Sequence, residues 1–306
     1  MKVEEAIAKV LKEGTRKRVE EEIEKARKLE VSLVPYGSKL YPKTLAEIHD
    51  PPVLLYVWGE KFGSLKEFSI AIVGSRKASS YGKAAASLIS GELSRNGVVI
   101  VSGLAYGIDS TAHAAALKNG TTVAVLGNGV DVVYPFVNGK LFEEVKKHGC
   151  LVSEFPFGTK PDKWTFPRRN RIIAGLSMGT VVVEAAKHSG SLITARLALE
   201  EGREVFAVPG PIFSSTSEGT NELIKEGAKC VTRADDVLNE FGYVSSVLVD
   251  RKDGDPILEC LKEGPKTVEE ICQSVGISID ELNVKLTMLE VNGDIECDSA
   301  GRFRVT

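Results

Sequence analysis

Several features are scarce in this sequence of 306 residues, and each scarcity removes a class of protein. There are five cysteines and four histidines, with no Cys-x-x-Cys pair and no two histidines at metal-ligand spacing. We therefore expect neither a disulfide framework nor a metal site. No apolar run approaches the ~20 residues of a membrane span, and the charged N-terminus has no apolar signal core. The sequence predicts a cytoplasmic protein without membrane association.

Basic and acidic side chains are also nearly equal in number. The chain holds 39 basic and 42 acidic side chains, a net charge of −3. This excludes a nucleic-acid binder that is basic throughout. Residues 243–306 carry 7 basic and 13 acidic side chains, so the C-terminal end is the most acidic part. Any site for a polyanion must be a local patch elsewhere.

From residue 70 onward, short β-branched runs alternate with helical segments that end at glycine. Glycine just past a helix is a common stop signal, and short runs that are apolar throughout fit strands covered on both faces. Strands separated by single helices imply right-handed βαβ units, so we predict an α/β fold with an extended Rossmann-like parallel sheet. The expected strands are residues 70–73, 98–101, 122–126, 151–153, 180–183, 204–208 and 229–231, and the expected helices are 81–96, 109–119, 139–148 and 191–201.

The same patterns predict four segments along the chain. Residues 1–64 form a short helical N-terminal segment and a lead-in, with helix over residues 1–30 and a strand near 53–58. The other segments are a Rossmann-like domain over 65–242, a linker over 243–255 and a winged-helix domain over 256–306.

The winged-helix prediction rests on two helix-start signals and a hairpin. Thr267 with Glu270 forms one capping box, and Ser278 with Glu281 forms a second. A turn at residues 299–301 then separates two short apolar runs. Helices followed by a hairpin in this order outline a winged helix-turn-helix.

Glycine- and serine-rich loops follow several of the predicted strands, where a doubly wound sheet binds its ligands. Gly74-Ser75-Arg76 follows the first strand, and its arginine is suited to paired hydrogen bonds with a phosphate. An ordinary strand-to-helix turn explains these residues equally well. Residues 102–109 and 187–194 also lead into helices, whose N-termini attract anions.

The most informative segment is residues 160–171, which hold five basic residues and two aromatic ones. Cations interleaved with rings suit single-stranded nucleic acid, because phosphates need charge and unstacked bases need aromatic partners. The alternative is a solvated loop that packs Trp164 and Phe166 into the core.

No arrangement of catalytic residues is evident. Glu154 and Glu184 follow strands, but nothing pairs them. Asp109 is expected to cap its own helix and His113 to pack within it. The chain has no GxSxG, Walker A or dinucleotide GxGxxG pattern. We therefore expect binding along an extended polyanion, with no enzymatic activity, no catalytic residue and no cofactor.

Several stretches and their combination resemble the bacterial DNA-processing protein A family, known as DprA or Smf. The resemblance covers roughly residues 36–242, and residues 41–59 look like the family's lead-in. The matching stretches are VGSRKASSYG (73–82), VSGLAYGIDSTAHAAAL (101–117), FPRRNRIIAGLS (166–177), VVEAAKHSGSLITARLALEEGREVFAVPG (182–210) and GTNELIKEGA (219–228).

The resemblance implies a non-catalytic protein that binds single-stranded DNA and loads the RecA recombinase onto it in natural transformation and recombination. It also implies a homodimer formed through the Rossmann domain. Arg76 and Lys187 are the strongest candidates for DNA contact, and Phe166 is a candidate for base stacking. The full set carried over is Ser75, Arg76, Gly103, Phe166, Arg168, Asn170, Arg171, Lys187, Ser189 and Gly190.

Two features depart from the family. Many members have a larger helical domain at the N-terminus, whereas here about 30 residues precede the stretch 31–35. The expected last helix of the winged domain, residues 280–291, has Lys285 as its only cation. We therefore expect this domain to serve protein contacts rather than to bind duplex DNA tightly.

Two alternative functions remain. A nucleotide-processing Rossmann enzyme would hydrolyse nucleoside monophosphates, and release of ribose or base would reveal it. Relatives with that activity use a PGGxGT–E arrangement, which Pro209-Gly210-Pro211 and residues 219–222 do not reproduce. A transcription factor led by the winged helix is disfavoured by the acidic tail.

Overall fold

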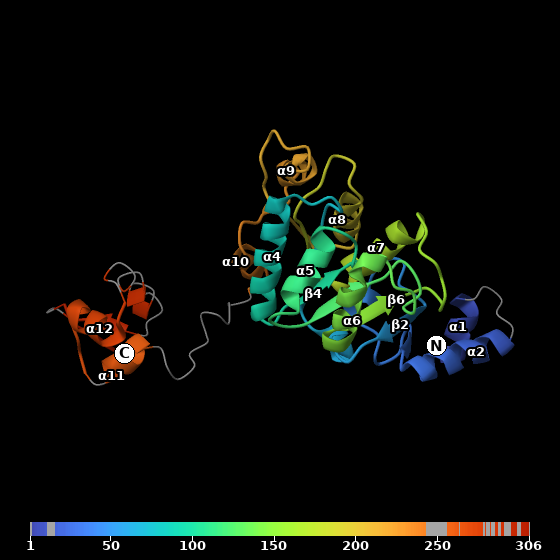
Figure 1. The fold of residues 1–306 in the computed structure, drawn as a ribbon, viewed down its shortest axis with the longest axis horizontal. Coiled ribbons are helices and arrows are strands. Elements are labelled where there is room, and N and C mark those ends of the chain that lie inside the picture. The colour runs from blue at the N-terminus through green and yellow to red at the C-terminus, as the bar shows by residue number, and fades with distance from the viewer. Residues whose placement is uncertain are drawn as a thin grey trace. The chain divides into compact units, whose positions relative to one another are not determined.

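The computed structural model of the chain has a nine-stranded sheet at the centre of its N-terminal unit (Figure 1). The chain divides into two compact units, Met1–Ser245 and Ser246–Thr306. The structure describes residues 2–10, 16–242, 256–262, 264–277, 279, 282, 285, 286, 289, 290, 295–298 and 301–305.

The order of strands confirms the predicted α/β fold and extends it. It reads β1-β2-β6-β5-β4-β3-β7-β8-β9, and the seven strands from β6 to β9 in this order are parallel. Two strands from the lead-in add an antiparallel edge, with β2 on β6 and β1 on β2. The bounds are β1 Ser32–Pro35, β2 Leu54–Trp58, β3 Ser69–Val73, β4 Val99–Ser102, β5 Thr122–Val125, β6 Cys150–Ser153, β7 Gly179–Val182, β8 Glu204–Ala207 and β9 Lys229–Cys230.

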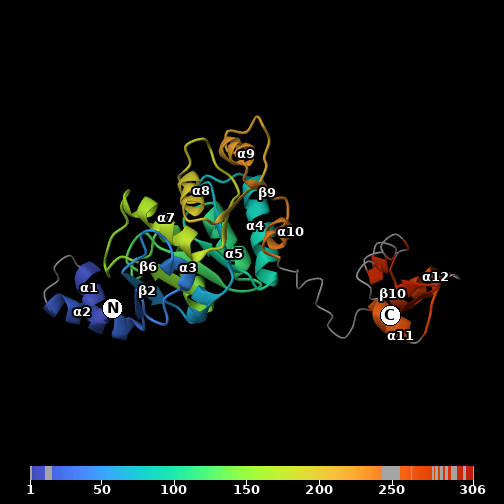
Figure 2. The same ribbon diagram turned by 180° about the vertical axis from the view of Figure 1, so that it is seen from behind.

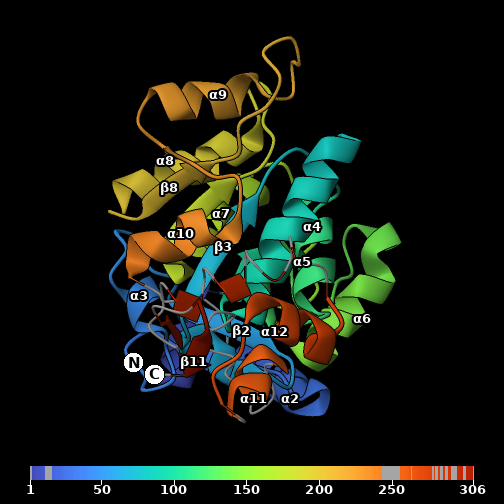
Figure 3. The same cartoon turned by 90° about the vertical axis from the view of Figure 1, so that its left-hand side faces the viewer.

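Helices cover both faces of the sheet, which explains why its strands are apolar throughout. Ile70 and Ile72 of β3 pack with α4, α5 and α10, while Ala71 and Val73 face the cluster that includes α3, α7 and α8. Figures 1 and 2 show these two layers from opposite sides, and Figure 3 shows α4 and α5 on one side of the strands and α8 on the other. The helices of this unit are α1 Val3–Val10, α2 Arg16–Leu29, α3 Lys43–Ala46, α4 Ser80–Arg95, α5 Ile108–Ala116, α6 Gly139–His148, α7 Thr165–Leu176, α8 Gly190–Glu200, α9 Glu218–Lys225 and α10 Ala234–Leu238, with 3₁₀ turns at Phe62–Lys66, Phe136–Asn138 and Asn239–Phe241.

The N-terminal segment consists of two helices rather than one and packs on the antiparallel edge of the sheet. Ala6 and Ile7 of α1 are buried against the same cluster as Tyr56 of β2. Lys25 of α2 forms an ion pair with Asp131 (Nζ–Oδ2 2.7 Å). These contacts attach α1 and α2 to the sheet that starts at residue 32, so the sheet reaches further towards the N-terminus than the expected boundary at residue 65.

The C-terminal unit contains helices and a hairpin in the order of a winged helix. The elements are α11 Pro256–Lys262, α12 Val268–Val275, β10 Ile295–Cys297 and β11 Phe303–Val305. The first capping box is confirmed, because Thr267 and Glu270 each accept the other's backbone N–H. The second box at Ser278 and Glu281, the expected linker over 243–255 and most of residues 280–291 lie outside the described residues. In the part of the chain that is described, no helix is long and apolar enough to cross a bilayer.

Candidate nucleic-acid interface

A large hollow in the N-terminal unit lies where the order of strands reverses. From β3 the chain builds outward through β4, β5 and β6, then returns to the other side of β3 as β7. Loops diverge at such a switch point and leave a crevice at the carboxyl ends of the strands. A cleft of about 700 Å³ opens there. Its polar and aromatic lining includes Ser75, Arg76, Lys77, Tyr134, Lys163, Phe166, Asn170, Ser189, Ser191 and Thr216.

Backbone contacts hold the Gly74-Ser75-Arg76 turn at the centre of this cleft. The N–H of Ser75 donates to the carbonyl of Glu184 (2.7 Å), and the carbonyl of Ser75 accepts from the N–H of Ile108 (3.2 Å). Gly107 has φ 78°, and a Cβ there would collide with the Ser75 carbonyl, so only glycine fits this close approach. The turn is thus fixed without using the exposed Arg76 side chain, which lines the cleft.

A second wall of the cleft is the beginning of α8. Ser189 caps this helix by accepting from the N–H of Ser191 (3.4 Å). Gly190 has open space around the position of a Cβ. The first N–H groups of an 11-residue helix therefore border the cleft, together with the positive end of its dipole.

Residues 165–171 of the basic segment form the first turns of a helix, where the sequence suggested a loop, and residues 160–164 precede that helix. α7 begins at Thr165, so Pro167 stands in its first turn, where the missing N–H costs no hydrogen bond. Ile172, Ile173 and Leu176 then supply a buried apolar stripe. Helical geometry separates the basic side chains onto different faces, which a loop would not do.

Arg169 of α7 is buried and connects the loop after β4 to the last residue of β5. Its side chain donates to the carbonyl of Gly103 (2.9 Å) and, through the same nitrogen, to the carbonyl of Val125. Burial lowers the pKa of Arg169 to about 10, which leaves it charged at neutral pH. A Cβ at Gly103 would lie 2.5 Å from the guanidinium, so Gly103 makes room for this arginine.

Asp109 and His113 of α5 accept hydrogen bonds from the backbone of the loop after β4. The carboxylate of Asp109 accepts from the N–H of Gly103 (3.2 Å) and of Ala105 (3.4 Å), which precede the helix, and Gly107 occupies the N-cap position. The expectation that Asp109 caps its own helix is therefore wrong. Burial raises the pKa of this carboxyl, and the nearby Arg169 opposes that shift.

His113 is packed inside the fold, as expected. Thr122 gives its hydroxyl proton to the carbonyl of Ile100 (2.6 Å), so its oxygen accepts from Nδ1 of His113 (2.7 Å). Nε2 then accepts from the N–H of Leu104 (3.3 Å). Both ring nitrogens are used in the neutral form, and a second proton would face the Leu104 N–H. Burial, followed by the charge of Arg169, lowers the pKa of His113 to about 3.

Rings and a guanidinium form a stack along one side of the cleft. The Arg76 guanidinium lies 5.1 Å from the centre of the half-buried Phe166 ring. The Tyr134 ring centre is 5.6 Å from that of Phe166, with a 31° angle between the ring planes. Cation–π contact orients the guanidinium while leaving its edge N–H groups for an anion.

Glu184, the carboxylate that follows β7, accepts hydrogen bonds from neighbouring parts of the fold. Glu184 is buried and accepts from the N–H (2.8 Å) and hydroxyl (2.6 Å) of Ser79, at the beginning of α4, and from the hydroxyl of Thr216 (3.1 Å). A Cβ at Gly82 would overlap this carboxylate. Glu184 thus ties α4 to the loop after β8 rather than facing the cleft.

Comparison with known proteins identifies the family. The sequence model for "DNA recombination-mediator protein A" matches residues 32–242, and the model for "DprA winged helix domain" matches residues 250–301. The chain belongs to the DNA recombination-mediator protein A family. This confirms the resemblance noted from the sequence motifs.

Curated relatives and solved structures agree with this assignment. The chain is 47% identical to DNA processing protein DprA of Bacillus subtilis over 69% of this chain and 71% of that protein. It is 42% identical to Protein Smf of Escherichia coli over 89% of this chain and 77% of that protein. The crystal structure of DprA from Streptococcus pneumoniae matches with a TM-score of 0.68 at 41% identity, covering 78% of this chain and 87% of that one. DNA processing protein A from Helicobacter pylori, in a structure described as showing its single-stranded DNA binding mode, matches with a TM-score of 0.63 at 32% identity, covering 70% and 96%.

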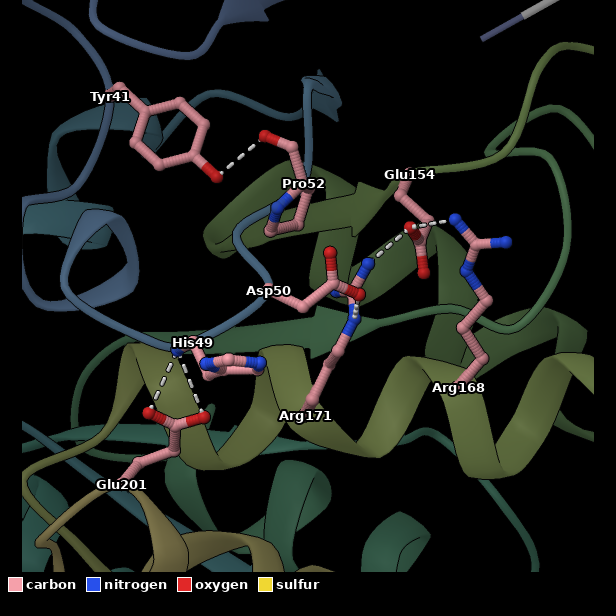
Figure 4. A network of polar contacts seen from close by, with 8 residues as sticks. All are labelled: Tyr41, His49, Asp50, Pro52, Glu154, Arg168, Arg171 and Glu201. Atoms are coloured by element: carbon pink, nitrogen blue, oxygen red, sulfur yellow. Dashed lines mark hydrogen bonds and ion pairs between the residues drawn. The ribbon is translucent and has the colours of Figure 1, made fainter. Parts of the chain in front are cut away.

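The residues carried over from the DprA family divide into two groups in space. Those that line the cleft are Ser75, Arg76, Phe166, Asn170, Ser189 and Gly190. Lys187 is exposed but is not among the lining residues, and Gly103 lies beneath Arg169. Arg168 and Arg171 are not among the lining residues and form ion pairs with Glu154 (Figure 4).

Sequence reasoning missed Lys163 and Tyr134 as lining residues. Lys163 was visible in the basic segment, but its direction depends on where α7 begins. Tyr134 lies in an irregular loop after β5, and no basic residue stands between Lys118 and Lys140 to mark it.

His113 makes the stability of this DprA family member sensitive to acid. In the unfolded chain the imidazole titrates near ~6.5, whereas in the fold it stays neutral down to about pH 3. Between these values only the unfolded state binds the proton, so the free energy of unfolding decreases as the pH falls below ~6.5, by up to ~1.4 kcal/mol per pH unit. We expect His113→Gln to show a shallower decrease than the parent between about pH 7 and about pH 5. Denaturant titrations at each pH measure this, and equal slopes would contradict it.

Proposed function

We propose that this chain binds single-stranded DNA in the cleft at the switch point and delivers the strand to the RecA recombinase. One observation carries the proposal: the Arg76 guanidinium stacks on Phe166 beside the N-terminus of α8. Hydrogen-bond donors for a phosphate and a base-stacking surface thus share one cleft, which is the combination that unstacked nucleic acid requires. The Helicobacter pylori relative, described as binding single-stranded DNA, supports the same ligand.

The charges in the cleft favour a polyanion. Its charged lining consists of Arg76, Lys77, Lys163, Arg169 and Asp109. The first three are exposed cations, whereas Asp109 is buried and its carboxylate already accepts backbone N–H groups. The surface offered to a ligand is therefore positive, although the chain as a whole is slightly acidic. Neutralising phosphates in such a cleft releases counterions and makes binding sensitive to salt.

The same lining favours binding over hydrolysis of a nucleotide. The lining contains no exposed carboxylate, and the carboxylates after β6 and β7, Glu154 and Glu184, are occupied by arginines and by Ser79 and Thr216. General acid–base chemistry needs such a group within reach of the substrate. We accordingly assign no catalytic residue and no cofactor.

The family description supplies the role of recombination mediator. The proposal adds a named partner, RecA. A recombination mediator must hold a strand and pass it on, and we propose that RecA in the cytoplasm receives it. We further propose that the protein acts as a homodimer through the Rossmann-like unit, so that two clefts hold one strand together.

Replacing Arg76 tests the cleft directly. We expect Arg76→Ala to weaken binding of a labelled single-stranded oligonucleotide about tenfold or more, since a hydrogen bond to a charged group is worth ~1.5–3 kcal/mol. The slope of log affinity against log salt should also decrease by about 0.7 for the lost phosphate contact. Fluorescence anisotropy over a salt series measures both quantities. Arg95→Ala, at the other end of α4, is a matched control with the same charge change; equal effects of the two variants would contradict the assignment.

Delivery to RecA requires a separate measurement. The parent protein should shorten the lag before RecA filaments form on single-stranded DNA, as followed by RecA's ATP hydrolysis. Arg76→Ala should lose this effect in proportion to its lost affinity, and Arg95→Ala should keep it. An unchanged lag with the parent protein, under conditions where it binds the DNA, would refute the delivery step while leaving the binding step intact.

A further inference from the structure

A second hollow lies on another face of α7, on the side of the antiparallel edge. Its volume is about 330 Å³. Its walls come from α1, from the lead-in to β2, from the loop after β6 and from α7 itself. The side chains that matter below are Lys9, Asp50, Glu154, Trp164, Arg168 and Arg171.

Helix α7 divides its side chains between this hollow and the first cleft. Phe166 and Asn170, four residues apart, line the first cleft. Trp164, Arg168 and Arg171, spaced four and three residues apart, share another face and line the second hollow. Lys163 belongs to the cleft and its neighbour Trp164 to the hollow, so the start of α7 connects the two.

Trp164 is an unusual side chain to leave in water. Its side chain makes an edge-on contact with Phe155, with ring centres 5.8 Å apart, yet the residue remains 58% exposed. Tryptophan combines a large apolar surface with a single donor, and its exposure beside cations is typical of a surface that receives an aromatic ligand.

The cations around Trp164 outnumber the carboxylates. Arg168 donates through Nη2 to Oε2 of Glu154 (3.1 Å), and the same oxygen accepts from Nη2 of Arg171 (2.6 Å) (Figure 4). Arg171 also pairs with Asp50 (Nε–Oδ2 3.1 Å). Two carboxylates therefore face three cations, the third being Lys9. Arg168 is half-exposed and has N–H groups to spare for a phosphate.

The network at this hollow is also incomplete. Oε1 of Glu154 and Nη1 of Arg171 are buried without a hydrogen-bond partner, and both side chains are at least nine-tenths buried. An unsatisfied buried donor and acceptor lower the stability of the fold, and such pairs are rare in native structures.

We propose that this hollow is a second subsite for the same single strand, in which a base stacks on Trp164 and the adjoining phosphates contact Arg168 and Lys9. The inference rests on the proposed function, because the strand reaches the hollow from the first cleft past Lys163. It assigns to Arg168 a phosphate contact that the first cleft does not provide.

The test compares two lengths of strand on the full-length protein. An oligonucleotide of about 4 nucleotides fills the first cleft only, whereas one of about 16 nucleotides reaches both subsites. We expect Trp164→Ala to weaken binding of the long oligonucleotide about tenfold, because stacking of one base on an aromatic ring is worth ~1–3 kcal/mol. Its affinity for the short oligonucleotide should not change. Trp164→Phe, which keeps a ring, should retain most of the affinity for the long strand.

Controls separate this inference from the function on which it rests. Phe213→Ala removes an aromatic side chain that is 97% exposed and lines neither hollow, so it should bind both strands like the parent. Arg76→Ala should weaken both lengths. If Arg76→Ala has no effect on the short strand, the proposed function fails. If Arg76→Ala acts as expected but Trp164→Ala binds the long strand like the parent, the second subsite alone is refuted.

A spectroscopic readout tests the stacking itself. The chain has two tryptophans, so Trp58→Phe leaves Trp164 as the sole tryptophan emitter. We expect its fluorescence to be quenched by the long oligonucleotide and to be unaffected by the short one. Equal quenching by both lengths, or none by either, would overturn the assignment of Trp164 to the second subsite.

Discussion

The buried guanidinium of Arg169 is the interaction on which the proposed binding surface depends. It is 4% exposed and joins the carbonyls of Gly103, after β4, and of Val125, at the end of β5, to the first turns of α7. A buried charge persists only where it is paired and hydrogen-bonded, and Asp109 supplies the opposite charge from α5. Removing one partner of such a buried pair typically costs ~3–5 kcal/mol, because the other charge is left without compensation. Since Arg169 fixes α7, it sets the position of Phe166 in the cleft and of Trp164 in the second hollow.

The fold was largely predictable because its signals are local. Short apolar runs marked the strands, and glycines marked helix ends, as at Gly97 and Gly202 with φ 78° and 66°. The sequence also placed the ligand site at the carboxyl ends of the strands, whereas the strand at which their order reverses is known only from the structure. The two antiparallel strands of the lead-in were harder to place, because proline-rich punctuation hid a pairing with β6 that is set by tertiary contacts.

The division of the basic segment was not predictable, because it depends on the phase of a helix. Five cations within twelve residues suggested one patch. Once α7 begins at Thr165, its turns direct Arg169 inward and Arg168 with Arg171 to another face. Helix boundaries are uncertain by a few residues from sequence alone, and an error of one residue rotates every side chain by about a quarter of a turn. Composition identified the basic segment, but only the structure shows which of its cations line the cleft.

The acidic residues show how a chain of net charge −3 can present a positive cleft. Asp109 and Glu184 lie close to the cleft, but backbone N–H groups and hydroxyls occupy both carboxylates. Glu154 takes up two guanidinium groups through one oxygen, so it offsets only part of their charge. What a ligand meets is therefore decided by which charges are already engaged, not by their number.

The two proposed subsites on one helix would suit the proposed role of holding a strand and then releasing it. A strand bound at two linked points gains affinity from the high effective concentration of the second point once the first is occupied. In this proposal each contact alone exchanges quickly, so that a recombinase displaces the strand from one subsite while the other still retains it. A single tight pocket would hold the same strand with equal affinity but would have to release it in one step. The arrangement of Phe166 and Trp164 on different faces of α7 therefore matches transfer better than storage.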